Sequence, residues 1–174
     1  IDPCTKGKKL AFMLNHADCK GAVVGDYAID NLNEIISACP NLKWIWLIGS
    51  DCEIPIRKKN FSEILSSNTD EMSIQVSNPE LPMQMLYTSG TTGDPKAILS
   101  PYARFGFVAS LGEALGLTKD DKPYTGLSLT HANAQLITLG TTLFMGLEAV
   151  FNQKFTKSRL WDITRHYDCT MFNL

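Results

Sequence analysis

The chain has 174 residues, 44% of them hydrophobic, which is enough for one domain of ordinary size with a substantial core. Its 16 Lys and Arg residues nearly balance its 18 Asp and Glu residues, and no basic stripe follows the chain, so nucleic acid is not an expected partner. No apolar run reaches the length of a membrane span, and residues 1–9 lack the apolar core of a secretory signal. We therefore expect a soluble, cytoplasmic protein without a transmembrane segment.

The first quarter of the chain alternates between helical and strand patterns. Residues 10–17 place their apolar side chains on one helical face, and the short apolar run 22–24 follows as a strand. Asp26 can cap a second helix whose apolar positions lie within residues 29–36. Residues 42–48, LKWIWLI, then have the composition of a second strand.

The middle of the chain is more polar. Residues 51–80 show little periodicity and are expected to form a surface connection with a short helix at residues 61–65. The basic residues 57–59 are expected to be a solvated loop, with a coenzyme A site as the alternative. Residues 83–87 are too apolar for a strand with a solvated face, and residues 97–99 form a second short strand.

The second half repeats the alternation of helix and strand. Its predicted helices are residues 105–115, 134–146 and 158–167, the last of them capped by Thr156 or Ser158. Its predicted strands, which alternate with these helices, are residues 124–129, 147–151 and 169–172. Strands separated by helix-length segments indicate an α/β fold with a mainly parallel sheet covered by helices on both faces. The chain stops within a strand pattern, whereas domain boundaries normally fall in exposed linkers, so residues 1–174 are predicted to be a single partial domain.

Residues 87–96 read YTSGTTGDPK and have the features of a phosphate-binding loop. Gly90 and Gly93 allow backbone angles that other residues avoid, so successive N–H groups can turn inward around an anion. Lys96 adds a mobile positive charge that can neutralise phosphate oxygens. Further donors come from the hydroxyls of Ser89, Thr91 and Thr92.

The alternative for this segment is an ordinary hairpin turn, for which Thr-Gly-Asp-Pro is suitable chemistry. A turn needs only two residues, whereas about ten small, hydroxylated or cationic residues follow an apolar strand here. The Walker pattern and the dinucleotide pattern G-x-G-x-x-G are both missing. Polyphosphate is therefore the expected ligand, without either of those two nucleotide-binding folds.

The sequence YTSGTTGDPKA resembles the signature loop of the adenylate-forming superfamily, which includes acyl-CoA ligases, firefly luciferase and the adenylation domains of peptide synthetases. Ala97 stands where that family usually has glycine. In the family, the loop holds the ATP triphosphate while a carboxylate attacks the α-phosphorus, which expels pyrophosphate and leaves an acyl-adenylate. The resemblance implies that Thr88 approaches Mg²⁺. The phosphate-binding set that it implies is Thr88, Ser89, Gly90, Thr91, Thr92, Gly93 and Lys96.

Residues 127–134, LSLTHANA, resemble the family segment usually written PLFH, with His131 on the histidine. The resemblance implies that His131 lies beside the acyl and adenylate pocket at the head of a helix, and we assign it the catalytic position. The alternative is a residue at a helix N-terminus that is satisfied by backbone contacts. His16 and His166 lie at predicted helix ends and are expected to be structural.

The resemblance extends over the whole chain but covers only a central part of the family's large N-terminal domain. The family's later acidic motif, its ribose-binding aspartate and its C-terminal lid domain have no counterpart within residues 1–174. The loop is thus expected to belong to a fragment of an ATP-dependent carboxylic acid:CoA ligase that uses ATP, Mg²⁺ and coenzyme A. The segment from residue 5 to 24 resembles acyl-CoA ligases, including those that activate crotonobetaine or carnitine, more than it resembles the adenylation domains of peptide synthetases.

The partners implied by this resemblance are a small-molecule carboxylic acid, ATP and coenzyme A. The isolated fragment is expected to be inactive and to self-associate through apolar surfaces exposed by truncation. The competing hypothesis is a non-catalytic nucleotide- or polyphosphate-binding module that retains only the loop.

Overall fold

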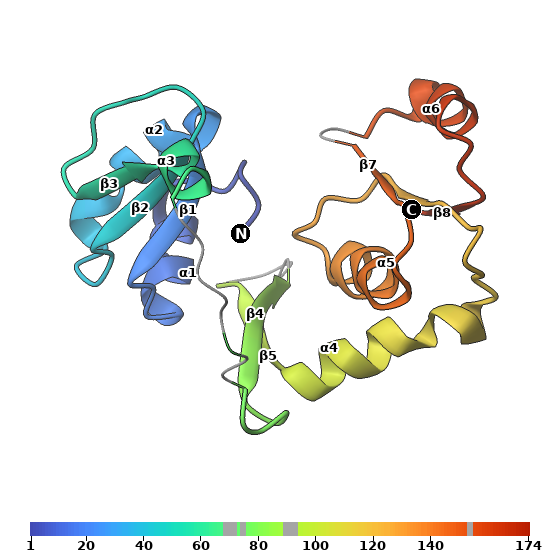
Figure 1. Ribbon diagram of the computed structural model, residues 1–174. Coiled ribbons are helices and arrows are strands. Elements are labelled where there is room, and N and C mark those ends of the chain that lie inside the picture. Colours follow the sequence, from blue (N-terminus) through green and yellow to red (C-terminus); the bar gives the residue numbers. More distant parts are fainter. Residues whose placement is uncertain (68–72, 74–75, 89–93, 153–154) are drawn as a thin grey trace. The chain divides into compact units, whose positions relative to one another are not determined.

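The computed structural model describes residues 1–67, 73, 76–88, 94–152 and 155–174. The chain forms two compact units, which Figure 1 colours from blue to green and from green to red. The N-terminal unit comprises Ile1–Gln75 and Tyr87–Ala97, and the C-terminal unit comprises Val76–Leu86 and Ile98–Leu174. Each unit has its own three-stranded sheet.

The N-terminal unit is built around a parallel sheet with the strand order β1-β2-β3 (Figure 1). Its strands are β1 (Gly21–Gly25), β2 (Trp44–Ile48) and β3 (Arg57–Asn60). Its helices and 3₁₀ turns are α1 (Gly7–His16), η1 (Asp26–Ala28), α2 (Ile29–Asn33), η2 (Ile36–Ala38) and α3 (Phe61–Leu65). The predicted helix at residues 61–65 is therefore confirmed.

One face of this sheet carries the core of the unit. Ile45 and Leu47 of β2 are each only 1% exposed and pack with aliphatic residues of α1 and α2. Burying such a side chain stabilises the fold by about 1.5–3 kcal/mol relative to leaving it exposed. Since side chains alternate along a strand, Trp44 and Trp46 lie on the opposite face, with ring centroids 5.3 Å apart.

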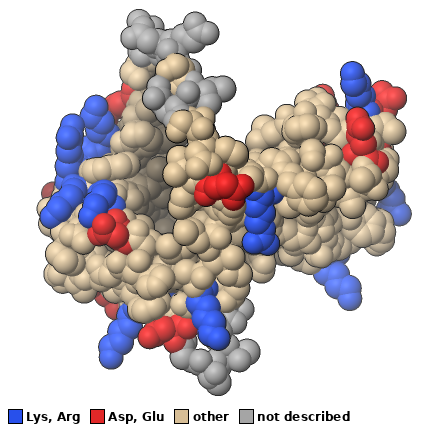
Figure 2. Space-filling model, turned by 90° about the horizontal axis from the view of Figure 1, so that it is seen from below, with Lys and Arg blue, Asp and Glu red and all other residues tan. Residues whose placement is uncertain are grey.

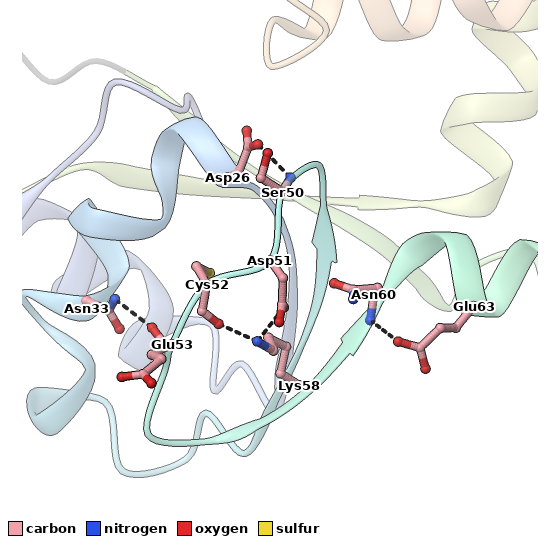
Figure 3. A network of polar contacts seen from close by, with 9 residues as sticks. All are labelled: Asp26, Asn33, Ser50, Asp51, Cys52, Glu53, Lys58, Asn60 and Glu63. Carbon is pink, nitrogen blue, oxygen red and sulfur yellow. Dashed lines mark hydrogen bonds and ion pairs between the residues drawn. The ribbon is translucent and has the colours of Figure 1, made fainter.

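Two local predictions in this unit are wrong. Residues 57–59 do not form a loop, because they belong to β3, which pairs with β2 and places Lys58 beside Ile45. A strand with one paired neighbour tolerates charged side chains, so it lacks the apolar alternation that signals a strand. The ammonium group of Lys58 contacts the Asp51 carboxylate and the Cys52 carbonyl (Figure 3).

The second wrong prediction concerns Asp26, which does not cap α2. Its carboxylate accepts a hydrogen bond of 2.7 Å from the Ser50 N–H, and this bond holds the pKa of Asp26 below its usual range (Figure 3). Gly49, with φ of +107°, makes the turn that brings the Ser50 N–H to this position. Asp26 thus links the ends of β1 and β2.

Strands β4 (Pro82–Thr88) and β5 (Lys96–Pro101) form a two-stranded sheet. The end of β4 contacts the start of β5 through Thr88 and Lys96, and Leu81 before β4 accepts a hydrogen bond from the N–H of Tyr102 after β5, so the pair is antiparallel. No residue of β4 is buried, and Met83 is 39% exposed, so the expectation of a strand without a solvated face is wrong. The faces of a strand are covered by packed helices or by a second sheet, and no side chain of β4 is covered enough to be buried.

The C-terminal unit contains a second parallel sheet, with the order β7-β6-β8. Its strands are β6 (Pro123–Thr125), β7 (Val150–Phe151) and β8 (Met171–Asn173). Its helical segments are α4 (Tyr102–Ala109), η3 (Ser110–Leu115), the π-helical η4 (Ala134–Leu139), α5 (Gly140–Met145), η5 (Lys157–Arg159) and α6 (Leu160–His166). Tyr124 of β6 is fully buried and packs with Leu160 and Ile163 of α6.

The α/β fold class is confirmed, because both units combine helices with strands that pair in parallel. The strands are divided among three sheets. On the face displayed in Figure 2, acidic and basic side chains lie in small groups, often next to one another, with uncharged surface between the groups. Within the described ranges, no helix combines the length and the apolar character needed to cross a membrane.

Candidate functional site

The predicted phosphate-binding loop lies between β4 and β5. Thr88 is the last residue of β4, and Lys96 is the first residue of β5. The loop members Ser89, Gly90, Thr91, Thr92 and Gly93 lie outside the described residues. The structure therefore gives the geometry of the two stems that carry the loop.

The two stems are joined at the mouth of the loop. The Thr88 hydroxyl donates a hydrogen bond of 3.3 Å to the backbone carbonyl of Lys96. Because this bond uses the hydroxyl hydrogen, the lone pairs of the Thr88 oxygen stay available to a cation. A neutral oxygen of this kind suits Mg²⁺, which prefers oxygen ligands, so the residue present fits the metal role predicted for it.

The side chain of Lys96 is exposed beside this mouth. Within the described part of the chain it forms no ion pair, so its charge is not neutralised by a neighbouring carboxylate there. Pro95, the preceding residue, is buried, and its ring fixes the backbone angle φ. Lys96 therefore follows an anchored residue while its own ammonium group remains accessible to an anion.

Tyr87 anchors the other stem. Its side chain lies on the opposite side of β4 from that of Thr88, because successive side chains alternate along a strand. The Tyr87 hydroxyl donates to the Met13 carbonyl at 3.1 Å and lies 2.9 Å from Nδ1 of His16. The two rings meet edge to face, with centroids 5.9 Å apart. Burial raises the pKa of Tyr87.

Sequence reasoning missed this contact. His16 ends α1, as expected, but its ring contacts a residue 71 positions further along the chain. No local pattern marks such a pair, since only the fold brings α1 beside β4.

His131 lies in the segment between β6 and η4, at the head of the helical residues. Its backbone N–H donates to the Ser128 carbonyl at 2.9 Å, and its carbonyl accepts from the Gln135 N–H at 3.1 Å. Its imidazole is exposed and has no hydrogen-bond or ionic partner among the described residues. The ring is thus free to contact a ligand.

A polar pair lies in the same part of the C-terminal unit. The side-chain amides of Asn133 and Asn173 bond to each other reciprocally, at 3.1 Å and 2.8 Å. The hydroxyl of Thr125 donates to the Asn173 carbonyl at 3.0 Å. Thr125 and Asn173 end the parallel strands β6 and β8, and ligands of α/β sheets bind beyond the carboxyl ends of strands. Sequence reasoning missed this pair, although an asparagine at the end of a predicted strand was a usable signal.

Cation-binding side chains do not gather into one cluster in the described residues. Within those ranges, no group of three or more His, Cys, Asp and Glu residues could hold a metal ion. The role of Thr88 toward Mg²⁺ remains a prediction that rests on a single hydroxyl.

Two curated relatives match nearly the whole chain. The chain is 24% identical over 175 residues to Medium/long-chain-fatty-acid--CoA ligase FadD17 of Mycobacterium marinum, and the match covers 99% of this chain and 32% of the relative. It is 29% identical over 168 residues to Long-chain fatty acid transport protein 6 of Mus musculus, and this match covers 94% of the chain and 27% of the relative. The chain thus spans about a third or less of the relatives that it matches.

Solved structures show the same fold. The anthranilate CoA ligase AuaEII in complex with anthranoyl-AMP superposes with a TM-score of 0.87 at 20% identity, over 99% of this chain and 34% of that chain. The long-chain-fatty-acid-CoA ligase FadD1 from Archaeoglobus fulgidus superposes with a TM-score of 0.85 at 22% identity, over 99% of this chain and 33% of that chain.

A family model described as AMP-binding enzyme matches residues 1–174. This match confirms the resemblance that the loop sequence indicates, and it extends that resemblance to the segments on both sides of the loop. The chain therefore belongs to the AMP-binding enzyme family.

Proposed function

We propose that the complete protein containing this chain is an ATP-dependent carboxylic acid:CoA ligase. It activates an acid as an acyl-adenylate with release of pyrophosphate and then transfers the acyl group to the thiol of coenzyme A. The observation that carries this proposal is the YTSGTTGDPK loop, set between two stems that the Thr88–Lys96 bond holds together, with an exposed lysine at the mouth. Family membership supports it.

In the first half-reaction, a carboxylate oxygen of the acid forms a bond to the α-phosphorus while the bond to pyrophosphate breaks. Negative charge then grows on the pyrophosphate oxygens, and preorganised N–H groups together with a lysine stabilise it. We assign this role to the loop and to Lys96. Thr88 would hold part of a bound Mg²⁺ ion, which would supply further positive charge for the phosphate oxygens.

In the second half-reaction, the thiol sulfur of coenzyme A bonds to the acyl carbon, and AMP leaves. We place His131 beside the acyl group on the strength of its exposed, unpaired ring at the head of a helix. The names of the two curated relatives refer to medium- or long-chain fatty acids, and this supports fatty acids as the first substrates to test. Crotonobetaine- and carnitine-type acids form the second group.

The first test is acid-dependent exchange of labelled pyrophosphate into ATP by the complete protein, measured over a panel of carboxylic acids. We expect Lys96→Ala to lower kcat/KM for ATP by about tenfold to about a hundredfold, because a phosphate-directed charge is lost. Lys119→Ala is the matched control, since Lys119 is also exposed but is part of neither β4 nor β5.

Two results would contradict the proposal. An unchanged kcat/KM for ATP in Lys96→Ala would remove this residue from the site. Binding of ATP without exchange for any acid would favour a non-catalytic nucleotide-binding module.

The isolated 174-residue chain is expected to form no acyl-adenylate, because orienting ATP and the acid together takes more groups than one loop provides. Exposed apolar side chains such as Phe107, Leu143 and Phe144, each at least 64% exposed, should make it self-associate. Sedimentation of the purified chain measures this directly. A monomer with robust exchange activity would refute both expectations.

A further inference from the structure

The Tyr87 hydroxyl connects the end of α1 to the strand that leads into the phosphate loop. Tyr87 immediately precedes Thr88, and its hydroxyl lies within hydrogen-bonding distance of the Met13 carbonyl and the His16 ring. His16 is the last residue of α1, and its ring also stacks on Phe12, with centroids 5.3 Å apart. The ring that Tyr87 contacts is therefore itself fixed by the helix.

The hydrogens at this contact can be assigned by counting donors. A tyrosine hydroxyl has one hydrogen, and here it is donated to the Met13 carbonyl at 3.1 Å. The 2.9 Å contact with His16 then requires Nδ1–H of the imidazole as the donor and the Tyr87 oxygen as the acceptor. The Met13 carbonyl also accepts from the Ala17 N–H at 3.1 Å, so it keeps a partner when the Tyr87 hydroxyl is removed.

This contact anchors a stem that contains no fully buried side chain. No residue of β4 is buried, and Thr88, which follows Tyr87, is exposed. On the other stem, the buried Pro95 has the corresponding position before Lys96. Both ends of the loop are thus anchored one residue away from the two side chains that face the predicted polyphosphate.

We propose that Tyr87 and His16 form a positioning pair that holds the N-terminal stem of the loop in place for the adenylate-forming half-reaction. This inference rests on the proposed function of the loop. Neither residue contacts ATP in this scheme, and both act by fixing Thr88 and the loop backbone. Catalysis that depends on orientation is sensitive to displacements of about an ångström, so a loosened stem lowers the rate of this step.

The test uses Tyr87→Phe in the complete protein, because this variant removes the hydroxyl and keeps the ring. We expect kcat/KM for ATP in pyrophosphate exchange to fall by about three- to tenfold, the effect of losing one or two ordinary hydrogen bonds at an orienting position. Thioester formation from preformed acyl-adenylate should change by less than about twofold. Tyr27→Phe is the matched control, since the Tyr27 side chain is 73% exposed.

Variants of His16 test the partner. His16→Asn keeps an N–H donor close to the position of Nδ1 and should retain most of the exchange activity, whereas His16→Leu should resemble Tyr87→Phe. The double variant Tyr87→Phe/His16→Leu should be little worse than either single variant, because both remove the same contact. Thermal unfolding of each variant shows whether the fold is retained.

Three outcomes would overturn the inference while leaving the proposed function intact. These are normal exchange in Tyr87→Phe, equal losses in both half-reactions, and losses in the double variant that multiply those of the single variants. Absence of acid-dependent exchange in the unmodified protein would instead overturn the proposed function, and this inference with it.

Discussion

In the N-terminal unit, the sheet β1-β2-β3 and its helices bury one large cluster of apolar side chains, whereas the cluster around Tyr124 in the C-terminal unit is small. Buried hydroxyls accompany the second cluster, among them those of Thr141 and Thr142 in α5. These hydroxyls bond to their own helix: Thr141 donates to the Ile137 carbonyl and Thr142 to the Thr138 carbonyl. Burial of hydroxyls therefore does not by itself mark a ligand site. An exposed side chain without a hydrogen-bond partner among the described residues, such as the imidazole of His131, is the better guide to a candidate site.

The largest expected difference between the units is in stability. Ile45→Ala removes a side chain that is 1% exposed within the large cluster and should destabilise the complete protein by about 4 kcal/mol. Ile163→Ala, at a residue that is 9% exposed in the small cluster, should cost about 2 kcal/mol. Urea denaturation measures both values. Equal losses would mean that the two cores are equally well packed.

The next difference concerns the two substrates. His131→Ala in the C-terminal unit should raise KM for the acid by about tenfold and change KM for ATP by less than about twofold. Lys96→Ala in the N-terminal unit should act mainly on ATP. Steady-state kinetics with each substrate varied in turn separates the effects, and His166→Ala, at the end of α6, is the control. A rise in KM for ATP alone would move His131 out of the acid pocket.

A smaller effect is expected at Tyr124, where the C-terminal core contains a buried hydroxyl. This hydroxyl accepts a hydrogen bond of 2.9 Å from the Asn152 amide. Tyr124→Phe should lower the free energy of unfolding by about 1 kcal/mol, because the amide loses its partner. The control is Tyr102→Phe, whose side chain is 38% exposed. Equal urea midpoints for the two variants would show that water replaces the bond.

The smallest effect should come from the surface pair of Asp51 and Lys58 in the N-terminal unit. The hydrogen bond from Lys58 lowers the pKa of Asp51 below its ordinary value of 3.8, and the same bond raises the pKa of Lys58 above 10.5. The lowered carboxyl pKa adds stability above pH 3.8 that is lost as the pH falls through the folded-state value. The raised ammonium pKa adds stability below pH 10.5 that is lost as the pH rises through the folded-state value.

We therefore expect the difference in unfolding midpoint between the unmodified protein and Asp51→Asn to be small and constant at neutral pH. It should shrink in acid below the ordinary pKa of the carboxyl. A difference that grows in acid would contradict this sign.

The local pattern of apolar residues predicted those strands and helices that are apolar along most of their length. The run LKWIWLI contains β2, and residues 134–146 contain η4 and α5. The prediction failed at β3, where Arg57, Lys58 and Lys59 pair with β2 through their backbones while their side chains follow no apolar pattern. It also failed at Asp26, whose carboxylate has a partner from the end of another strand.

The candidate site shows the same limit. Thr88 and Lys96 can be proposed from the sequence because the loop motif is contiguous, and in the structure the Thr88 hydroxyl bonds to the Lys96 carbonyl. The contact between His16 and Tyr87 depends on how the N-terminal unit brings Tyr87 to the end of α1, and it cannot be read from either segment alone. The pairing of Asn133 with Asn173 likewise needs the parallel arrangement of β6 and β8.

The π-helical turns of η4 give the His131 region a property that an α-helix would lack. A π-turn holds one residue more than an α-turn, so deletion of one residue within Ala134–Leu139 would convert the segment to α-helix. Because the wider π-turn already absorbs that extra residue, the segments on the two sides of the deletion would keep nearly the same orientation about the helix axis, whereas deletion of one residue from an ordinary α-helix rotates them by about 100° relative to each other. The loss of one residue here would therefore leave the polar end of the helix and α5 in their present orientations. Homologous proteins that are one residue shorter in this segment would keep both the polar helix end and the core contacts of α5.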